Sequence, residues 1–308
     1  MRHLLLATAA LLLTSAAANA ATHFSFVTLD NASDPTFNQL LGINNAGTIA
    51  GYFGSGAAGH PNKGYTIAAP YTAFVADNLP GSVQTQATGI NAANATTGFW
   101  SDTNHGGDAN FGFIRWNNNG RLTYLSVNDP LVSSNPPINQ LLGINKGNVA
   151  VGFYNDGNNP SNSHAFSYSV KTTAFTPVKI GGAVSAAATG INTSGQICGF
   201  FVNGLQHTVG FVKNATGGVV THFTVPGTTF TQLLGINNHG QAVGFFQGAD
   251  MVPHGLLYTP GNGAWTQVDD PNGSLGTVVN GVNDVGQLVG FYTDAAGNVH
   301  GMLVTVSH

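Results

Sequence analysis

Glutamate is absent from this chain, and charged residues of every kind are scarce. Its 308 residues include twelve acidic residues, all of them aspartate, and eight lysines and arginines. Because so few basic residues cannot form an extended patch, the composition argues against nucleic acid or an anionic membrane surface as a partner. The missing glutamate and rare lysine also remove residues that usually build surface helices, so we expect a chain of strands and turns.

Cysteine is equally rare. The single cysteine, Cys198, excludes a disulfide within the chain, so stability has to come from a buried core. We interpret Cys198 as a small buried side chain rather than a nucleophile. The sequence also lacks Gly-x-Ser-x-Gly, His-Glu-x-x-His and calcium-loop motifs. Without glutamate, a carboxylate pair for glycoside cleavage would have to consist of two aspartates.

One long hydrophobic run stands at the N-terminus. A basic start at Arg2, an apolar stretch over residues 4–13 and small residues at 18–20 are typical of a secretory signal peptide. The apolar stretch is shorter than the roughly 18 residues that a membrane-spanning helix needs. We therefore expect residues 1–20 to be removed after Ala20, leaving a secreted or periplasmic protein without membrane insertion.

A sixfold repeat fills the rest of the sequence. Each copy has Gly-Ile-Asn, or Gly-Val-Asn in the last, and then a glycine and two aromatic residues that begin nine residues after its opening glycine. Successive copies start 47, 54, 47, 45 and 46 residues apart, a period that favours a repeat array or a propeller. The opening glycines are Gly42, Gly89, Gly143, Gly190, Gly235 and Gly281.

Each copy predicts a small antiparallel sheet. Five residues after the opening glycine stands a glycine or an asparagine, which take positive φ readily, so a tight turn should join the first two strands. The asparagine of Gly-Ile-Asn should fold its side chain onto this turn. A third and a fourth strand follow. The turn residues are Gly47, Asn94, Asn148, Gly195, Gly240 and Gly286.

The two ends of the chain complement each other. The last copy stops after its third strand at His308, whereas a spare strand over residues 23–30 precedes the first copy. A ring closed by these two segments leaves only short sheet edges, and neither end resembles the polar cap of a solenoid. The sequence predicts an all-β fold: a single domain over residues 21–308, a six-bladed β-propeller whose last blade is closed by the N-terminal strand.

The repeat unit Gly-Ile-Asn-x-x-Gly-Gln-x-Val-Gly-Phe-Tyr, followed by a loop and His-(Ala/Gly)-Phe, resembles the HAF family of bacterial extracellular repeats. The pattern stands at residues 143–154 with His164-Ala-Phe, and almost as closely at residues 281–292 with His300-Gly-Met. The resemblance covers essentially the whole mature chain. It implies export and a propeller-like fold, and it implies no activity.

Candidate functional residues gather where the loops of such a fold would open on one face. There each blade contributes one histidine, the connections between blades contribute aspartates, and the second strands end in aromatic residues. Histidines of neighbouring blades would stand on the order of 10 Å apart, too far to share a metal unless their loops lean inward; we expect no metal and no cofactor. The candidate ligand-binding residues are His60, His105, His164, His207, His254, His300, Trp100, Tyr154, Tyr292, Asp129 and Asp270.

Three functions fit these patterns. Export, repeated crevices and the lack of a recognisable catalytic set favour a non-catalytic propeller that binds a glycan or another extracellular ligand on its loop face, with aromatic residues as stacking platforms. The alternative is a hydrolase or lyase, which predicts His164, His254 or His300 within hydrogen-bonding distance of an aspartate in a concave pocket. A scaffold protein without a small ligand is the third. The ligand and the oligomeric state stay open.

Overall fold

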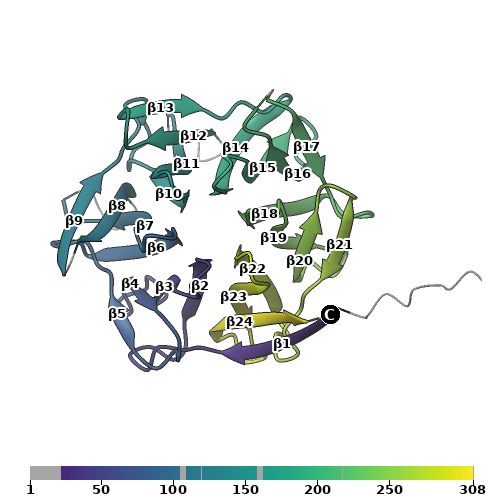
Figure 1. The fold of residues 1–308 in the computed structure, drawn as a ribbon, viewed down its shortest axis with the longest axis horizontal. Coiled ribbons are helices and arrows are strands. Elements are labelled where there is room, and N and C mark those ends of the chain that lie inside the picture. The colour runs from purple at the N-terminus through teal and green to yellow at the C-terminus, as the bar shows by residue number, and fades with distance from the viewer. Residues whose placement is uncertain (1–21, 105–108, 119, 158–161, 217, 308) are drawn as a thin grey trace, which may run out of the picture.

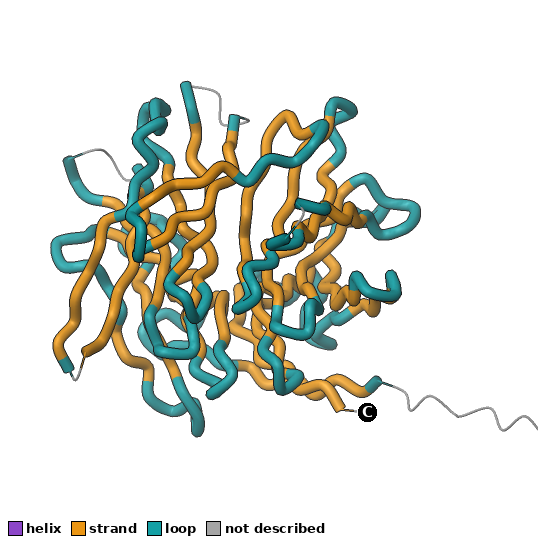
Figure 2. Tube along the Cα trace, turned by 45° about the horizontal axis from the view of Figure 1, so that its top comes forward, coloured by secondary structure: helices purple, strands orange, loops and turns teal. Residues whose placement is uncertain are grey.

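The computed structural model describes residues 22–104, 109–118, 120–157, 162–216 and 218–307. Within these residues the regular elements are strands, and no helix occurs (Figure 2). The all-β prediction is therefore confirmed for the described part of the chain. This part contains no helix that is long and apolar enough to cross a membrane.

The strands form six repeat units arranged around a common centre (Figure 1). Within a unit, successive strands pair antiparallel from the innermost outward. Units 1 to 3 consist of β2 (Asn38–Ile43), β3 (Ile49–Phe53), β4 (Lys63–Ile67) and β5 (Phe74–Ala76); β6 (Gln84–Ile90), β7 (Thr96–Ser101), β8 (Phe111–Asn118) and β9 (Arg121–Ser126); and β10 (Asn139–Ile144), β11 (Val149–Asn155), β12 (Ser163–Ser169) and β13 (Ala174–Pro177). Units 4 to 6 consist of β14 (Ala183–Ile191), β15 (Ile197–Asn203), β16 (Thr208–Lys213) and β17 (Val220–Phe223); β18 (Phe230–Ile236), β19 (Ala242–Gln247), β20 (Pro253–Thr259) and β21 (Ala264–Gln267); and β22 (Gly276–Val282), β23 (Gln287–Thr293), β24 (Val299–Ser307) and β1 (His23–Thr28).

Two pairings extend beyond consecutive strands. Thr208 of β16 pairs in parallel with Phe230 of β18, which joins units 4 and 5 into one eight-stranded sheet. In unit 6 the outermost strand is β1, which pairs antiparallel with β24 from His23 opposite Ser307 to Thr28 opposite Met302. This is the pairing between the first and last strands that the sequence predicts.

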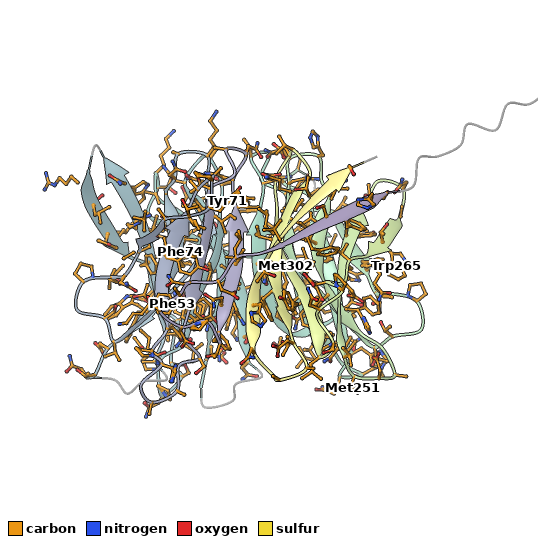
Figure 3. The ribbon with its side chains drawn as sticks, turned by 90° about the horizontal axis from the view of Figure 1, so that it is seen from below. Phe53, Tyr71, Phe74, Met251, Trp265 and Met302 are labelled. Carbon is orange, nitrogen blue, oxygen red and sulfur yellow. The ribbon has the colours of Figure 1, made fainter. Side chains whose placement is uncertain are left out.

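The antiparallel order separates two faces of the molecule. We call the face with the six Gly-Ile-Asn turns the turn face. The opposite face, with the loops between second and third strands and the connections from unit to unit, is the loop face. Figure 3 shows Tyr71, from the β4–β5 hairpin, toward the turn face, and Met251, from the β19–β20 loop, at the edge of the loop face.

The tight turns have the predicted geometry. All six turn residues have positive φ, between 55° at Asn148 and 82° at Gly195. The Asn44 side chain folds back as expected, because its Oδ1 accepts the backbone N–H groups of Ala46 and Thr48, each at 3.0 Å. The sequence reasoning therefore identified the role of the asparagine within its own turn.

The same asparagines also link one unit to the next, which the sequence reasoning missed. Each donates a hydrogen bond from Nδ2 to the backbone oxygen of the asparagine one unit on, and the sixth donates to the first. The six links run from Asn44 to Asn91 (3.0 Å), Asn91 to Asn145 (3.1 Å), Asn145 to Asn192 (3.1 Å), Asn192 to Asn237 (3.0 Å), Asn237 to Asn283 (3.2 Å) and Asn283 to Asn44 (3.1 Å).

Close backbone approach explains the opening glycines. A Cβ atom on Gly42 would lie 2.9 Å from Cα of Gly89, and one on Gly281 would lie 3.3 Å from Cα of Gly42. The innermost strands of successive units therefore leave no room for side chains at these positions. The hydrophobic core lies farther out, between neighbouring sheets. Cys198 is fully buried there, and desolvation raises the pKa of its thiol to about 12, consistent with an inert core residue.

Candidate functional site

Four of the predicted histidines lie against aspartates. His60 Nδ1 is 2.7 Å from Asp34 Oδ2, and His164 Nε2 is 2.9 Å from Asp156 Oδ2. His254 and His300 each contact two aspartates, as described below. His207 binds through its backbone N–H to Asn203 Oδ1. His105 lies outside the described residues.

The histidine of unit 6 is held on both ring nitrogens. His300 Nδ1 is 2.7 Å from Asp30 Oδ2, and its Nε2 is 3.2 Å from Asp294 Oδ2. Its ring stacks on the predicted Tyr292, with centroids 5.0 Å apart. Burial alone would lower the pKa of His300, but the hydrogen bonds with Asp30 and Asp294 raise it above its ordinary value.

Unit 5 repeats this arrangement. His254 Nδ1 is 2.7 Å from Asp269 Oδ2, its Nε2 is 3.0 Å from Asp250 Oδ2, and its ring lies 5.3 Å from that of Phe246. Burial opposes a positive charge here too, yet the two aspartates raise the pKa of His254. With both nitrogens engaged, these two imidazoles have no ring nitrogen left to bind a ligand.

Unit 3 brings three predicted residues to one cavity. Tyr154, His164 and Asp129 line a crevice of about 650 Å³ between units 3 and 4. The rings of Tyr154 and His164 stack with centroids 5.1 Å apart. Asp129 also has a structural role, because its Oδ1 accepts the N–H of Leu131 at 3.0 Å. The predicted Asp270 supports the corresponding turn before unit 6 in the same way.

A second cavity surrounds the predicted Trp100. It measures about 610 Å³ and lies at the loop-face ends of units 1 to 3. We call it the amide cleft, because five of its lining residues are asparagine or glutamine, and no lining residue is charged. The lining residues are Ser55, Gly56, Asn62, Gln84, Gln86, Phe99, Trp100, Ser101, Asn110 and Gln140.

Hydrogen bonds between units fix the orientation of these amides. Gln86 Nε2 of unit 2 donates to Asn62 Oδ1 of unit 1 at 2.8 Å, and Asn62 Nδ2 donates to the Gly54 carbonyl at 2.6 Å. Gln140 Nε2 of unit 3 donates in the same way to Asn110 Oδ1 of unit 2. The acceptor Oε1 atoms of Gln86 and Gln140 are consequently aimed away from these bonds.

Trp100 lines the cleft together with both amide pairs. Its ring packs against Phe111 with centroids 5.2 Å apart. Its indole N–H is buried and has no hydrogen-bond partner among the described residues. A buried donor without a partner costs about 1–3 kcal/mol.

The sequence reasoning found Trp100 but missed the amides around it. A signal was present, because glutamine stands three residues before the opening glycine in four copies, at Gln39, Gln86, Gln140 and Gln232. Asparagine precedes the third strand in units 1 and 2, where it meets that glutamine. Only the spatial neighbourhood of units 1, 2 and 3 reveals that these side chains share a cleft.

In the part of the chain that the structure describes, no three histidine, cysteine or acidic residues are placed to hold a metal ion. Each of the four paired histidines instead contacts aspartates that belong to its own sheet or to a segment adjoining it. The described histidines therefore do not meet at one point.

No protein-family model matches the chain, and no curated protein sequence matches it. Among solved structures it is similar to TolB from Acinetobacter baumannii, with 8% identity, a TM-score of 0.54, and coverage of 89% of this chain and 67% of that one. It is also similar to a mutant of the Aleuria aurantia lectin in complex with Fucalpha1-6GlcNAc, with 10% identity, a TM-score of 0.50, and coverage of 89% and 95%. The chain has a propeller-type fold. At these identities the likeness establishes the fold alone.

Proposed function

We propose that this chain is an exported, non-catalytic, six-bladed β-propeller that binds a neutral glycan in the amide cleft of its loop face. In this proposal each repeat unit is one blade, and β1 completes the sixth. The pairing of β1 with β24 and the hydrogen bond from Asn283 to Asn44 support a closed ring. The N-terminal pattern and the resemblance to HAF repeats support export.

The amide cleft is the observation that carries the binding proposal. Side-chain amides both donate and accept hydrogen bonds, as sugar hydroxyls do, so they match a hydroxyl-rich ligand without bringing charge to it. Trp100 supplies an apolar aromatic surface for the C–H face of a sugar ring. A volume of about 610 Å³ lies within the usual range for small-ligand sites.

The orientation of the amides adds to this argument. Because Gln86 and Gln140 are held by Asn62 and Asn110, little side-chain freedom remains to be lost on binding. The solved structure of the Aleuria aurantia lectin contains a sugar, which supports the idea that a propeller-type fold can present such a site. The binding proposal itself depends on the residues that line the amide cleft of this chain.

A glycan array with matched variants tests the proposal. The mature chain should bind neutral oligosaccharides, and Trp100→Ala and Gln140→Ala should each weaken binding by about 10-fold or more, the loss expected for a stacking platform or a buried hydrogen bond. Gln232→Ala is the control, because Gln232 occupies the same repeat position without lining the cleft. Binding of charged glycans alone, or an equal loss of glycan affinity in all three variants, would contradict the assignment of the site.

A hydrolase or lyase is the second candidate, favoured by the position of His164. This histidine lies beside Asp156 and lines the crevice between units 3 and 4, as a general base oriented by a carboxylate would. Against it, the same contact of Nε2 with an aspartate recurs at His254 and His300, so the pairing is a repeated structural feature. Turnover of polysaccharides or esters that disappears in His164→Gln would favour this alternative.

A further inference from the structure

Units 3 and 6 carry the same group of four side chains. An aspartate of the preceding connection, a tyrosine on the second strand, an aspartate two residues after it and a histidine on the third strand come together in both. In unit 3 these are Asp129, Tyr154, Asp156 and His164, and in unit 6 they are Asp270, Tyr292, Asp294 and His300.

In unit 6 the N-terminal strand closes this group. Asp30 accepts a hydrogen bond from the Gly301 N–H on Oδ1 at 2.9 Å, and its Oδ2 contacts His300 Nδ1 at 2.7 Å. Thr28 Oγ1 lies 3.0 Å from the Tyr292 hydroxyl. The hydroxyl of Thr28 on the outermost strand and the carboxylate of Asp30 just after it therefore satisfy the phenol, the imidazole and the backbone amide.

Capping of this backbone amide by a side chain is common in the molecule. In units 1, 2 and 5 the N–H of the glycine on the third strand also donates to the side chain of the second residue after the fourth strand. These bonds join Gly64 to Asn78, Gly112 to Asn128 and Gly255 to Asp269, each at 3.0 Å. Together with Gly301 and Asp30, four of the six units use an aspartate or asparagine here.

Unit 3 lacks the cap. The Val178 N–H donates to the Ala165 carbonyl, just as that of Leu29 donates to Gly301, so Lys179 stands where unit 6 has Asp30. Pro177, opposite Phe166, stands where unit 6 has Thr28. In an antiparallel pair the N–H and C=O of one residue point the same way, so the Ala165 N–H faces the position of the missing carboxylate.

A cavity occupies this position. The crevice of about 650 Å³ is lined by Asp129, His164, Ala165 and Lys179, and otherwise mainly by apolar and aromatic side chains. Leu131 and Val184, on its two sides, are 62% and 52% exposed, which leaves apolar surface uncovered. The Ala165 N–H, the His164 ring and the Lys179 side chain therefore border an apolar crevice at the position where other units place an anionic or amide side chain.

We propose that this crevice binds an apolar carboxylic acid, whose carboxylate takes the place that Asp30 has in unit 6. The Ala165 N–H and the Lys179 ammonium group hold the carboxylate, which lies beside the His164 ring. The apolar part of the ligand packs between Tyr154 and the residues that line unit 4. This site is separate from the amide cleft and does not depend on the glycan proposal.

Isothermal titration with three matched probes tests the site: 3-phenylpropionate, 3-phenylpropionamide and 3-phenylpropylamine. The acid should bind at least ~10-fold more tightly than the amide, since its charge-assisted hydrogen bonds are roughly twice as strong, and the amine should not bind. Lys179→Asp installs the carboxylate that units 5 and 6 already use. It should abolish binding of the acid by filling the site, without loss of folding.

Lys171→Asp is the matched control, because Lys171 is an exposed residue of the β12–β13 hairpin and lies outside the crevice. It should bind the acid like the wild type. Equal binding of acid and amide, unchanged binding by Lys179→Asp, or no binding of the acid at millimolar concentration would each overturn the proposal. Failure here would leave glycan binding intact, and Lys179→Asp should not alter glycan affinity.

Discussion

Replacing Arg115 with methionine would remove one half of an ion pair that lies inside the protein. Arg115 on β8 and Asp77 after β5 are 4% and 0% exposed, and the arginine Nε is 2.7 Å from Asp77 Oδ1. Thr96 completes the group, accepting a hydrogen bond from the arginine at 3.0 Å and donating one to Asp77 Oδ2 at 2.6 Å. The pair therefore joins unit 1 to unit 2 out of contact with water.

The cost of this change follows from the charge that stays behind. Removing one partner of a buried ion pair typically costs about 3–5 kcal/mol, because the other charge remains without compensation. Between units 2 and 3 the corresponding positions hold Val127, Ala150 and Tyr168, which pack in one apolar cluster. The triple variant Asp77→Val, Thr96→Ala, Arg115→Tyr copies that cluster and should match or exceed wild-type stability, by up to about 4 kcal/mol.

Urea unfolding followed by circular dichroism would measure both variants against the wild type. The triple variant should be at least as stable as the wild type, and Arg115→Met should be much less stable than both. A loss under about 1 kcal/mol in Arg115→Met would mean that the pair is better solvated than its burial indicates. A triple variant less stable than Arg115→Met would refute the equivalence of the two contacts between units.

Three further predictions concern single residues of the repeat units. The pKa of His300 is raised in the folded protein, so the stability that its charged form contributes is fully present below the unfolded pKa of about 6.5 and is lost as the pH rises through the folded pKa. The difference in unfolding free energy between wild type and His300→Gln should therefore be larger at pH 6 than at pH 9. Asn237→Ala should cost about 1–3 kcal/mol by denaturant unfolding, since it removes a link to the next unit and two hydrogen bonds within its turn. Gly143→Ala should cost about 1–3 kcal/mol, because its Cβ would lie 2.8 Å from a backbone oxygen, whereas Gly204→Ala, with nothing within 4 Å, should change the melting temperature little.

Much of the fold could be predicted because its signals are local. A glycine or asparagine at the turn position indicates a positive φ, whatever residues surround it. Asn44 likewise bonds to its own turn, at a backbone amide only four residues away. The period of the repeat then sets the number of units. The N-terminal strand was assigned to β24 by counting strands rather than by any feature of its own residues.

Contacts between units were beyond sequence reasoning. The sequence gives no physical reason for the opening glycine, whose constraint comes from another glycine about one repeat away, as for Gly42 and Gly89. The buried pair of Asp77 and Arg115 is equally hidden, since neither residue recurs in the other copies. A repeat pattern in the sequence identifies features that all units share, and it does not identify a contact that occurs in only one unit.

The candidate site illustrates the same limit. His164, Tyr154 and Asp129 were chosen for their position in the repeat, and the structure places them around one crevice. Trp100 was chosen as an aromatic residue, but its polar surroundings depend on Gln140, which comes from the next unit. Composition argued only against nucleic acid and an anionic membrane surface as partners, and it did not indicate a cleft lined by amides.

Calorimetric titration of the mature chain with a neutral oligosaccharide, side by side with Trp100→Ala and Gln232→Ala, tests the central claim most directly. The account predicts saturable one-to-one binding by the wild type and by Gln232→Ala, and binding at least about 10-fold weaker by Trp100→Ala. Heat of binding that is unchanged in Trp100→Ala, or absent from the wild type for every neutral sugar on the array, would contradict it.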